Sequence, residues 1–134
     1  MRDYIIVTDS CCDFPAKMVK ELELTVLPLS FTMEGREYRN FPDNRDMDPD
    51  VFYGKLRSGL LGTTSAVSPG IFQAAMTPIL EAGKDILCIS FSSGLSTTYQ
   101  SAVIAAGELA EAYPDSTIRV VDSRAASLGQ GLLI

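Results

Sequence analysis

The segment from Ser92 to Thr98 concentrates side chains that could bind a charged group. It carries five hydroxyls in seven residues, where an apolar run ends and a helical pattern begins. The first backbone N–H groups of a helix have no intrahelical partner, and the helix dipole is positive there, so an oxyanion is favoured. A helix N-cap alone needs only one hydroxyl. The excess of hydroxyls therefore predicts a site for an anionic ligand.

The chain contains no histidine, and this absence bears on how the serines could act. A serine nucleophile of the triad type needs histidine as its base. A nucleophile elbow also needs the pattern G-x-S-x-G, whereas the segment from Gly94 to Thr98 lacks the second glycine. We therefore interpret these serines as hydrogen-bond donors to a bound anion rather than as nucleophiles.

A second group of hydroxyls, Thr63 to Ser65, precedes another helix start at Ser68 and Pro69. Ser68 could cap that helix on its own, with Pro69 in the first turn. Capping therefore explains Ser68 but leaves the three hydroxyls before it without a role.

Two aspartates, Asp9 and Asp122, each follow an apolar, β-branched run that predicts a buried strand. A carboxylate at a strand end could serve as an acid–base group in catalysis. Aspartates in such positions more often cap turns or helices. Both interpretations stay open at this level.

The acidic run at 43–50 suggests a calcium loop. An EF-hand that starts at Asp46 would place Val51 where glycine is needed and Arg57 where the bidentate glutamate belongs. The three cysteines, two of them adjacent, form neither a disulfide framework nor a C-x-x-C metal motif. We expect no metal site and no cofactor.

Apolar periodicity divides the chain into alternating strands and helices. Strands are predicted at 4–8, 24–31, 85–91 and 117–121, with a bend or sheet edge at Pro28 and a short strand or loop at 36–40. Helices are predicted to begin near Pro15, Asp48, Ser68, Leu95 and Ala125. Their expected apolar faces are Met18, Val19 and Leu22; Val51, Phe52 and Leu56; Phe72, Ala75, Met76, Ile79 and Leu80; and Leu95, Tyr99, Ala102, Ala106, Leu109 and Tyr113.

This alternation predicts an α/β fold, a three-layer domain in which helices flank a mostly parallel sheet. Ligands of such sheets bind at the carboxyl ends of the strands. The side chains expected to gather at that edge are those of Asp9, Ser10, Ser92, Ser93, Asp122 and Ser123, together with the backbone of Gly94.

The composition narrows the classes of partner. The formal net charge is −6, and eleven basic residues are scattered among seventeen acidic ones. Nucleic-acid binding needs clustered Lys and Arg to neutralise phosphates, so we expect no nucleic-acid partner. No apolar run approaches the ~18 residues that span a bilayer, so we do not expect an integral membrane protein. The odd, unpaired cysteines suggest a reduced, cytoplasmic setting.

Motifs along the whole chain resemble the DegV-like fatty-acid-binding proteins, which include the lipid-carrying subunit of bacterial fatty acid kinase. The motifs that carry the resemblance are Val7-Thr8-Asp9-Ser10, Thr64-Ser65 with Ser68-Pro69, Ser92-Ser93-Gly94-Leu95-Ser96, and Val121-Asp122-Ser123. Two departures are Ala66 and Thr97, where the family usually has glutamine and glycine. The resemblance implies a two-domain fold about twice this length. Residues 1–134 then form a truncated N-terminal domain, without the C-terminal one.

The resemblance also implies a function. Thr64 and Ser93 would hold the carboxylate of a long-chain, palmitate-like fatty acid, surrounded by Ser65, Ser92 and Ser96. The protein would be a non-catalytic carrier that presents its lipid to a separate ATP-binding kinase subunit, which forms an acyl phosphate. Two alternatives remain: a phosphoryl- or acyl-transfer enzyme that uses Asp9 or Asp122, and an interaction domain without a ligand.

Overall fold

The core of the molecule is a four-stranded parallel sheet, seen here in a computed structural model that describes residues 2–134. The strand order is β2-β1-β6-β7. The strands are β1 (Tyr4–Asp9), β2 (Thr25–Leu27), β6 (Asp85–Ser90) and β7 (Ile118–Asp122). All three pairings are parallel, which confirms the predicted α/β class.

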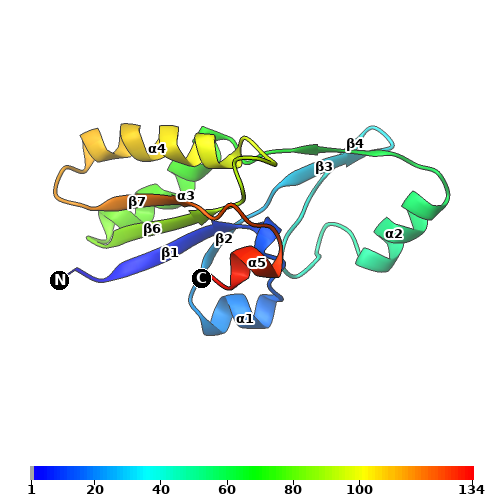
Figure 1. The fold of residues 1–134 in the computed structure, drawn as a ribbon, viewed down its shortest axis with the longest axis horizontal. Coiled ribbons are helices and arrows are strands. Elements are labelled where there is room, and N and C mark those ends of the chain that lie inside the picture. The colour runs from blue at the N-terminus through cyan, green and yellow to red at the C-terminus, as the bar shows by residue number, and fades with distance from the viewer. Residues whose placement is uncertain (1) are drawn as a thin grey trace.

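Helices flank this sheet, and the order of the strands decides which face each helix covers. From β1 the chain crosses to β2 at one edge of the sheet, and from β6 it crosses to β7 at the opposite edge. Right-handed crossovers therefore place the connecting helices on opposite faces. Figure 1 shows α4 above the sheet and α1 below it. The helices are α1 (Ala16–Glu21), α3 (Pro69–Glu81), α4 (Thr98–Ala112) and the short α5 (Leu128–Gly131), and a 3-10 turn, η1 (Ser10–Cys12), follows β1.

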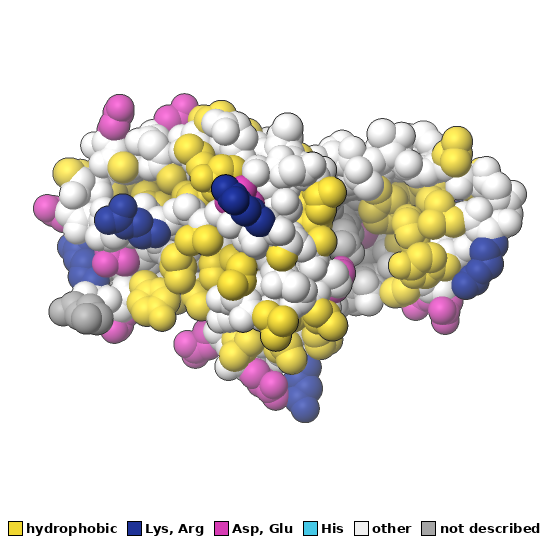
Figure 2. All heavy atoms as spheres, in the orientation of Figure 1, with side chains coloured by type: hydrophobic (Ala, Val, Ile, Leu, Met, Phe, Trp, Pro, Cys, Tyr) yellow, Lys and Arg dark blue, Asp and Glu magenta, His cyan; other side chains and the backbone are white. Residues whose placement is uncertain are grey.

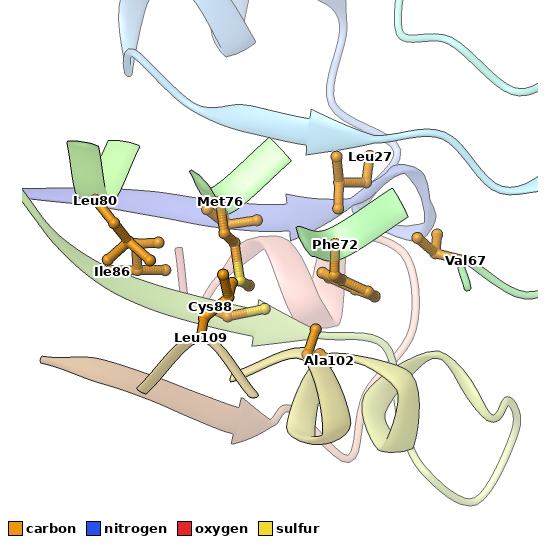
Figure 3. Packing of buried hydrophobic residues seen from close by; sticks show 11 residues of the cluster. Leu27, Val67, Phe72, Met76, Leu80, Ile86, Cys88, Ala102 and Leu109 are labelled. Atoms are coloured by element: carbon orange, nitrogen blue, oxygen red, sulfur yellow. The ribbon is translucent and has the colours of Figure 1, made fainter. Parts of the chain in front are cut away.

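The hydrophobic core lies between the sheet and the pair α3 and α4 (Figure 3). Val7 and Cys88 are in register on β1 and β6 and are fully buried. Phe72 and Met76 of α3 pack against them, also fully buried. The predicted face of α3 is confirmed, because its apolar residues recur at the spacing of a helix that covers a sheet.

A small antiparallel sheet, with order β4-β3-β5, extends beyond the core as an arm (Figure 1). It consists of β3 (Ser30–Met33), β4 (Arg36–Arg39) and β5 (Gly62–Ser65), accompanied by α2 (Pro49–Arg57). At Pro28 the chain leaves the large sheet and enters the small one, so the predicted bend is confirmed. Asp48 caps α2 with its side chain, as expected.

Several predicted boundaries and faces are wrong. The strand β5 forms at Gly62–Ser65, where no strand was predicted. No residue of α2 is buried, and Val51 is 51% exposed, because α2 lies on the arm rather than on the core. Leu95 is 66% exposed and precedes α4. The last helix starts at Leu128 rather than Ala125, because the positive φ of Ser127 interrupts a right-handed helix.

The buried faces predicted for α1 and α2 are wrong, and the physical reason is the same for both. Both helices are short amphipathic elements at the periphery, where little protein lies against them. Met18 and Leu22 of the α1 segment are 39% and 51% exposed, and Leu56 of α2 is 37% exposed. Only Phe52 finds a partner on the arm, where its ring meets Phe31 edge-on at 5.1 Å.

Candidate ligand site at the carboxyl edge of the sheet

The turn between β6 and α4 presents the hydroxyls of Ser92, Ser93 and Ser96. The backbone N–H groups of Leu95 and Ser96 donate to the carbonyl of Ser92 at 3.0 and 3.1 Å, which closes the turn. The helix α4 begins at Thr98, so these three hydroxyls precede its first turn. Gly94 has no positive φ, and a Cβ there would meet only the Ser92 hydroxyl at 3.5 Å. The turn is thus built by its own hydrogen bonds, with Ser93 exposed on its outer side.

Ser93 is tied to the end of the neighbouring strand. Its hydroxyl donates to Asp122 Oδ2 at 2.5 Å, and its backbone N–H donates to Oδ1 of the same carboxylate at 3.1 Å. The hydrogen bond from the Ser93 hydroxyl, helped by that from its N–H, holds the pKa of Asp122 below its usual range. Asp122 is half-buried and Ser93 is exposed, so the pair can contact a ligand.

Asp9 lies at the end of the central strand β1 and is fully buried. Its Oδ1 accepts from the N–H of Cys11 at 3.1 Å, and its Oδ2 accepts from the N–H of Phe91 at 2.7 Å. The Ser90 hydroxyl also donates to Oδ2, at 3.2 Å. The carboxylate therefore joins β1, β6 and the turn η1. With both oxygens occupied and no exposed surface, Asp9 has a structural place rather than one facing a substrate.

Gln130 is a further buried polar residue that the sequence did not reveal. It is 0% exposed, and its amide Nε2 donates to Thr8 Oγ1 at 3.0 Å and to Asp9 Oδ1 at 3.3 Å. These bonds fasten α5 over the carboxyl end of β1. Gly131 beside Gln130 packs closely against Phe14, where a Cβ would lie 2.5 Å from the ring.

Thr64 and Ser65 lie on opposite faces of the arm. Phe31 of β3 is in register with both Tyr38 and Thr64, so these three share one face. Side chains alternate along a strand, and Ser65 therefore points to the other face. Thr64 and Ser65 cannot present their hydroxyls from the same side, although both were expected around one ligand.

The face of the arm that carries Thr64 borders a hollow of about 380 Å³. Figure 2 shows the recess on this side, between the main body and the lobe that carries α2, with apolar side chains on the lobe. Its apolar lining consists of Cys11, Leu29, Phe31, Met47, Pro49, Phe52 and Tyr53. Its polar lining consists of Asp13, Ser30, Asn40, Asn44 and Thr64. The sequence did not predict this hollow, because its aromatic residues come from segments that pair only in the folded arm.

The two hydroxyl-rich segments meet where β5 runs into α3. The backbone N–H of Val67 donates to Thr98 Oγ1 at 3.4 Å, and Thr98 Oγ1 lies 2.9 Å from Ser96 Oγ. The end of β5 is therefore adjacent to the turn that carries Ser93. Within residues 2–134, no residue of 92–98 lines the hollow beside Thr64. The contact between the two hydroxyl-rich segments is made at Val67, outside the lining of the hollow.

Two other predicted strand-end hydroxyls are structural. Ser10 is 5% exposed and accepts from the N–H of Leu29 at 3.0 Å and from the Asn40 amide at 3.3 Å, which fixes the start of the arm. The Ser123 hydroxyl donates to the carbonyl of Ala125 at 3.2 Å. The Ser123 proton is therefore committed to Ala125, and Ser10 is buried at the start of the arm.

Among residues 2–134, the thiols and acidic groups form no cluster suited to a metal ion. Burial raises the pKa of the Cys11 and Cys88 thiols to about 12, so they stay protonated. In the part of the chain that the structure describes, no group of three Cys, Asp or Glu side chains could hold a metal ion. None of the helices formed by residues 2–134 has the length and apolarity needed to cross a membrane.

Comparison with known proteins identifies the family. The model of the DegV family, whose description reads "uncharacterised protein, DegV family", matches residues 4–134. The chain belongs to the DegV family. A DegV domain-containing protein of Clostridium perfringens is 44% identical over all 134 residues, which make up 46% of that relative. This chain thus spans about half the length of the curated relatives it matches.

Solved structures with the same fold include proteins that are described as binding fatty acids. A stearic acid-binding protein of Eubacterium ventriosum is 31% identical, with a TM-score of 0.87 over 97% of this chain and 44% of the other. A fatty-acid-binding DegV protein of Thermus thermophilus is 36% identical, with a TM-score of 0.85 over 99% of this chain and 45% of the other. The predicted family and fold class are both confirmed.

Proposed function

We propose that this chain forms one wall of a fatty-acid site, with the carboxyl group of the lipid bound near Thr64 and Ser93. The observation that carries the proposal is the position of Thr64, a hydroxyl on the rim of an apolar hollow. The fatty acids bound by the DegV proteins of Eubacterium ventriosum and Thermus thermophilus support the same ligand class. Ser96 and Ser92 stand behind Ser93 in the turn and shape it through their hydrogen bonds.

The energetics favour a ligand whose tail supplies most of the affinity. Burying ~14 methylenes at ~0.8 kcal/mol each contributes a gross ~11 kcal/mol, before the costs of association. A hydrogen bond to a charged group adds only ~1.5–3 kcal/mol. The hydroxyls therefore set the orientation of the lipid, and the apolar surface sets the strength of binding.

The other wall of the site, in this proposal, belongs to a C-terminal domain like that of the longer relatives. Tyr4, Leu132 and Val121 are 58%, 90% and 40% exposed. Figure 2 shows apolar side chains spread over the face of the molecule that it draws. A second domain packed there would remove such surface from water, which is the usual fate of exposed apolar patches of this kind.

The protein acts, we propose, as a non-catalytic carrier that presents the lipid to an ATP-binding fatty acid kinase subunit. Neutral hydroxyls suit this role, because a buried arginine would pair tightly with the carboxylate that must react. The burial of Asp9 supports it as well, since it removes one of the two carboxylates that a transfer enzyme could use. Formation of acyl phosphate, trapped with hydroxylamine in the presence of the kinase subunit and ATP, tests this step.

The lipid site is tested by extracting the purified protein and identifying released fatty acids by mass spectrometry. We expect a long-chain fatty acid, and a fall in occupancy when Thr64→Ala is combined with Ser93→Ala. Thr63→Ala is the matched control, because Thr63 neighbours Thr64 on β5 but points to the opposite face. The 134-residue chain should be compared with a chimera in which the remaining part of the Clostridium perfringens relative follows Ile134. Absence of fatty acid from both proteins, even after lipid is added, would refute the proposal.

A further inference from the structure

The hydroxyl of Ser93 has its single proton committed to Asp122. Three donors orient this carboxylate: the Ser93 hydroxyl at 2.5 Å, the Ser93 N–H at 3.1 Å and the Arg124 N–H at 3.1 Å. A carboxylate can only accept, so the proton in the short O–H···O bond comes from the serine. Ser93 Oγ can therefore offer a ligand its lone pairs but no proton.

Thr64 complements this arrangement. It is exposed on β5, and the hydrogen of an exposed hydroxyl rotates to suit its partner. In the proposed site, Ser93 thus contributes an acceptor and Thr64 contributes a hydroxyl that can donate. A neutral carboxylic acid matches this pair, because its O–H can donate to Ser93 Oγ while its carbonyl accepts from Thr64. A carboxylate would instead meet an acceptor, with the negative charge of Asp122 directly behind it.

We infer that this site binds the fatty acid in its protonated form, and that Asp122, acting through Ser93, is the residue that imposes this choice. The inference rests on the proposed function and adds the protonation state of the ligand. Two carboxylates that share one hydroxyl repel each other, which raises the pKa of the one that is less well stabilised. The proton stays on the ligand, because the donors around Asp122 stabilise its charged form.

The surroundings of Asp122 leave the ligand as the group that titrates. The strand β6 places Ser90 in register with Asp122, and the turn after it contributes only serine hydroxyls and backbone at this point. The helix α4 carries no charged residue before Glu108. Arg124, on the same loop as Asp122, is the charged side chain that acts on it. Arg124 is exposed, where solvent and salt screen its charge.

Binding above the pKa of the free acid, which is ~4–5 as for other carboxyls, must then take up a proton. Decanoic acid, soluble enough for titration calorimetry, is the probe, measured at pH 8 in two buffers of different ionisation enthalpy. We expect uptake of about one proton per ligand and an affinity that falls about tenfold per pH unit between pH 6 and 8. Decan-1-ol, a donor without charge, should bind with no such pH dependence.

Asp122→Asn separates the charge from the shape of the site. In asparagine the side-chain oxygen accepts the two backbone N–H groups, and its NH2 group faces Ser93 Oγ as a donor. The Ser93 proton is then free for a carboxylate, so we expect proton uptake to vanish and decanoate affinity at pH 8 to rise about tenfold or more. Asp85→Asn is the matched control, because Asp85 likewise accepts a backbone N–H, that of Thr117, but at the start of β6. It should retain the wild-type proton uptake.

The outcomes are distinct, and wild-type protein alone decides between them if Asp122→Asn fails to fold. Both the 134-residue chain and the chimera described above are titrated. Decanoate binding without proton uptake overturns this inference and leaves the proposed function intact. Failure of both proteins to bind either probe overturns the proposed function, and the inference with it. Proton uptake that persists in a folded Asp122→Asn variant refutes the assignment to Asp122.

Discussion

Replacement of Asp9 by alanine tests whether this residue holds the fold together or serves chemistry. The change removes the acceptor of two partly buried backbone N–H groups, those of Cys11 and Phe91, which are bonded to it at 3.1 and 2.7 Å. Each buried donor left without an acceptor costs ~1–3 kcal/mol, so the two together cost ~2–6 kcal/mol. The Gln130 amide also loses one acceptor but keeps Thr8.

We therefore expect Asp9→Ala to lower the free energy of unfolding by about 4 kcal/mol, a large part of the ~5–15 kcal/mol of a typical domain. Urea unfolding of the 134-residue chain, followed by circular dichroism, measures this quantity. Asp122→Ala is the matched control: Asp122 accepts three hydrogen bonds, where Asp9 accepts four, but water can replace it at its half-exposed position. A loss of less than ~1 kcal/mol for both variants would refute the structural role of Asp9.

Two further predictions concern packing and pH. Gly131→Ala should lower the free energy of unfolding by ~1–3 kcal/mol, because its Cβ would lie 2.5 Å from the Phe14 ring. Gly107→Ala, at an open position of α4, should raise the free energy of unfolding by ~0.5–1 kcal/mol, measured by the same urea unfolding. The pKa of Asp122 is lowered by the Ser93 hydroxyl, so the stability from this pair is present above the unfolded pKa and is lost as the pH falls through the folded value. Acid titration of the melting temperature should show this loss in wild type and a smaller one in Ser93→Ala.

Two of the helix starts, those of α2 and α3, were predictable because they depend on local chemistry. Ser68 and Asp48 cap α3 and α2 as expected, each followed by a proline in the first turn. The buried face of α3 was predictable for a similar reason, since Phe72 and Met76 recur at helical spacing. Caps and helical spacing depend only on residues that are close together in the sequence, so the sequence is enough to predict them.

The strand β5 was not predictable in this way, and half of the candidate site depends on it. Its sequence, Gly62 to Ser65, has no apolar alternation, and all four residues are exposed. It becomes a strand because β3 pairs with it, with Phe31 opposite Thr64. Pairing between distant segments also decides that Thr64 faces the hollow while Ser65 faces away. The hydroxyl cluster could be found from sequence, but the side on which each hydroxyl lies could not.

Asp9 and Asp122 show how the order of the strands decides function. Both follow an apolar strand and precede a serine, so the local sequence treats them alike. The strand β1 lies inside the sheet, where β6 and α5 enclose Asp9 completely. The strand β7 lies at the edge, which leaves Asp122 half-buried and in contact with the exposed Ser93. The same residue type at the same kind of strand end thus stabilises the fold in one case and, in our proposal, selects the ligand in the other. Only the order of the strands in the sheet separates the two roles.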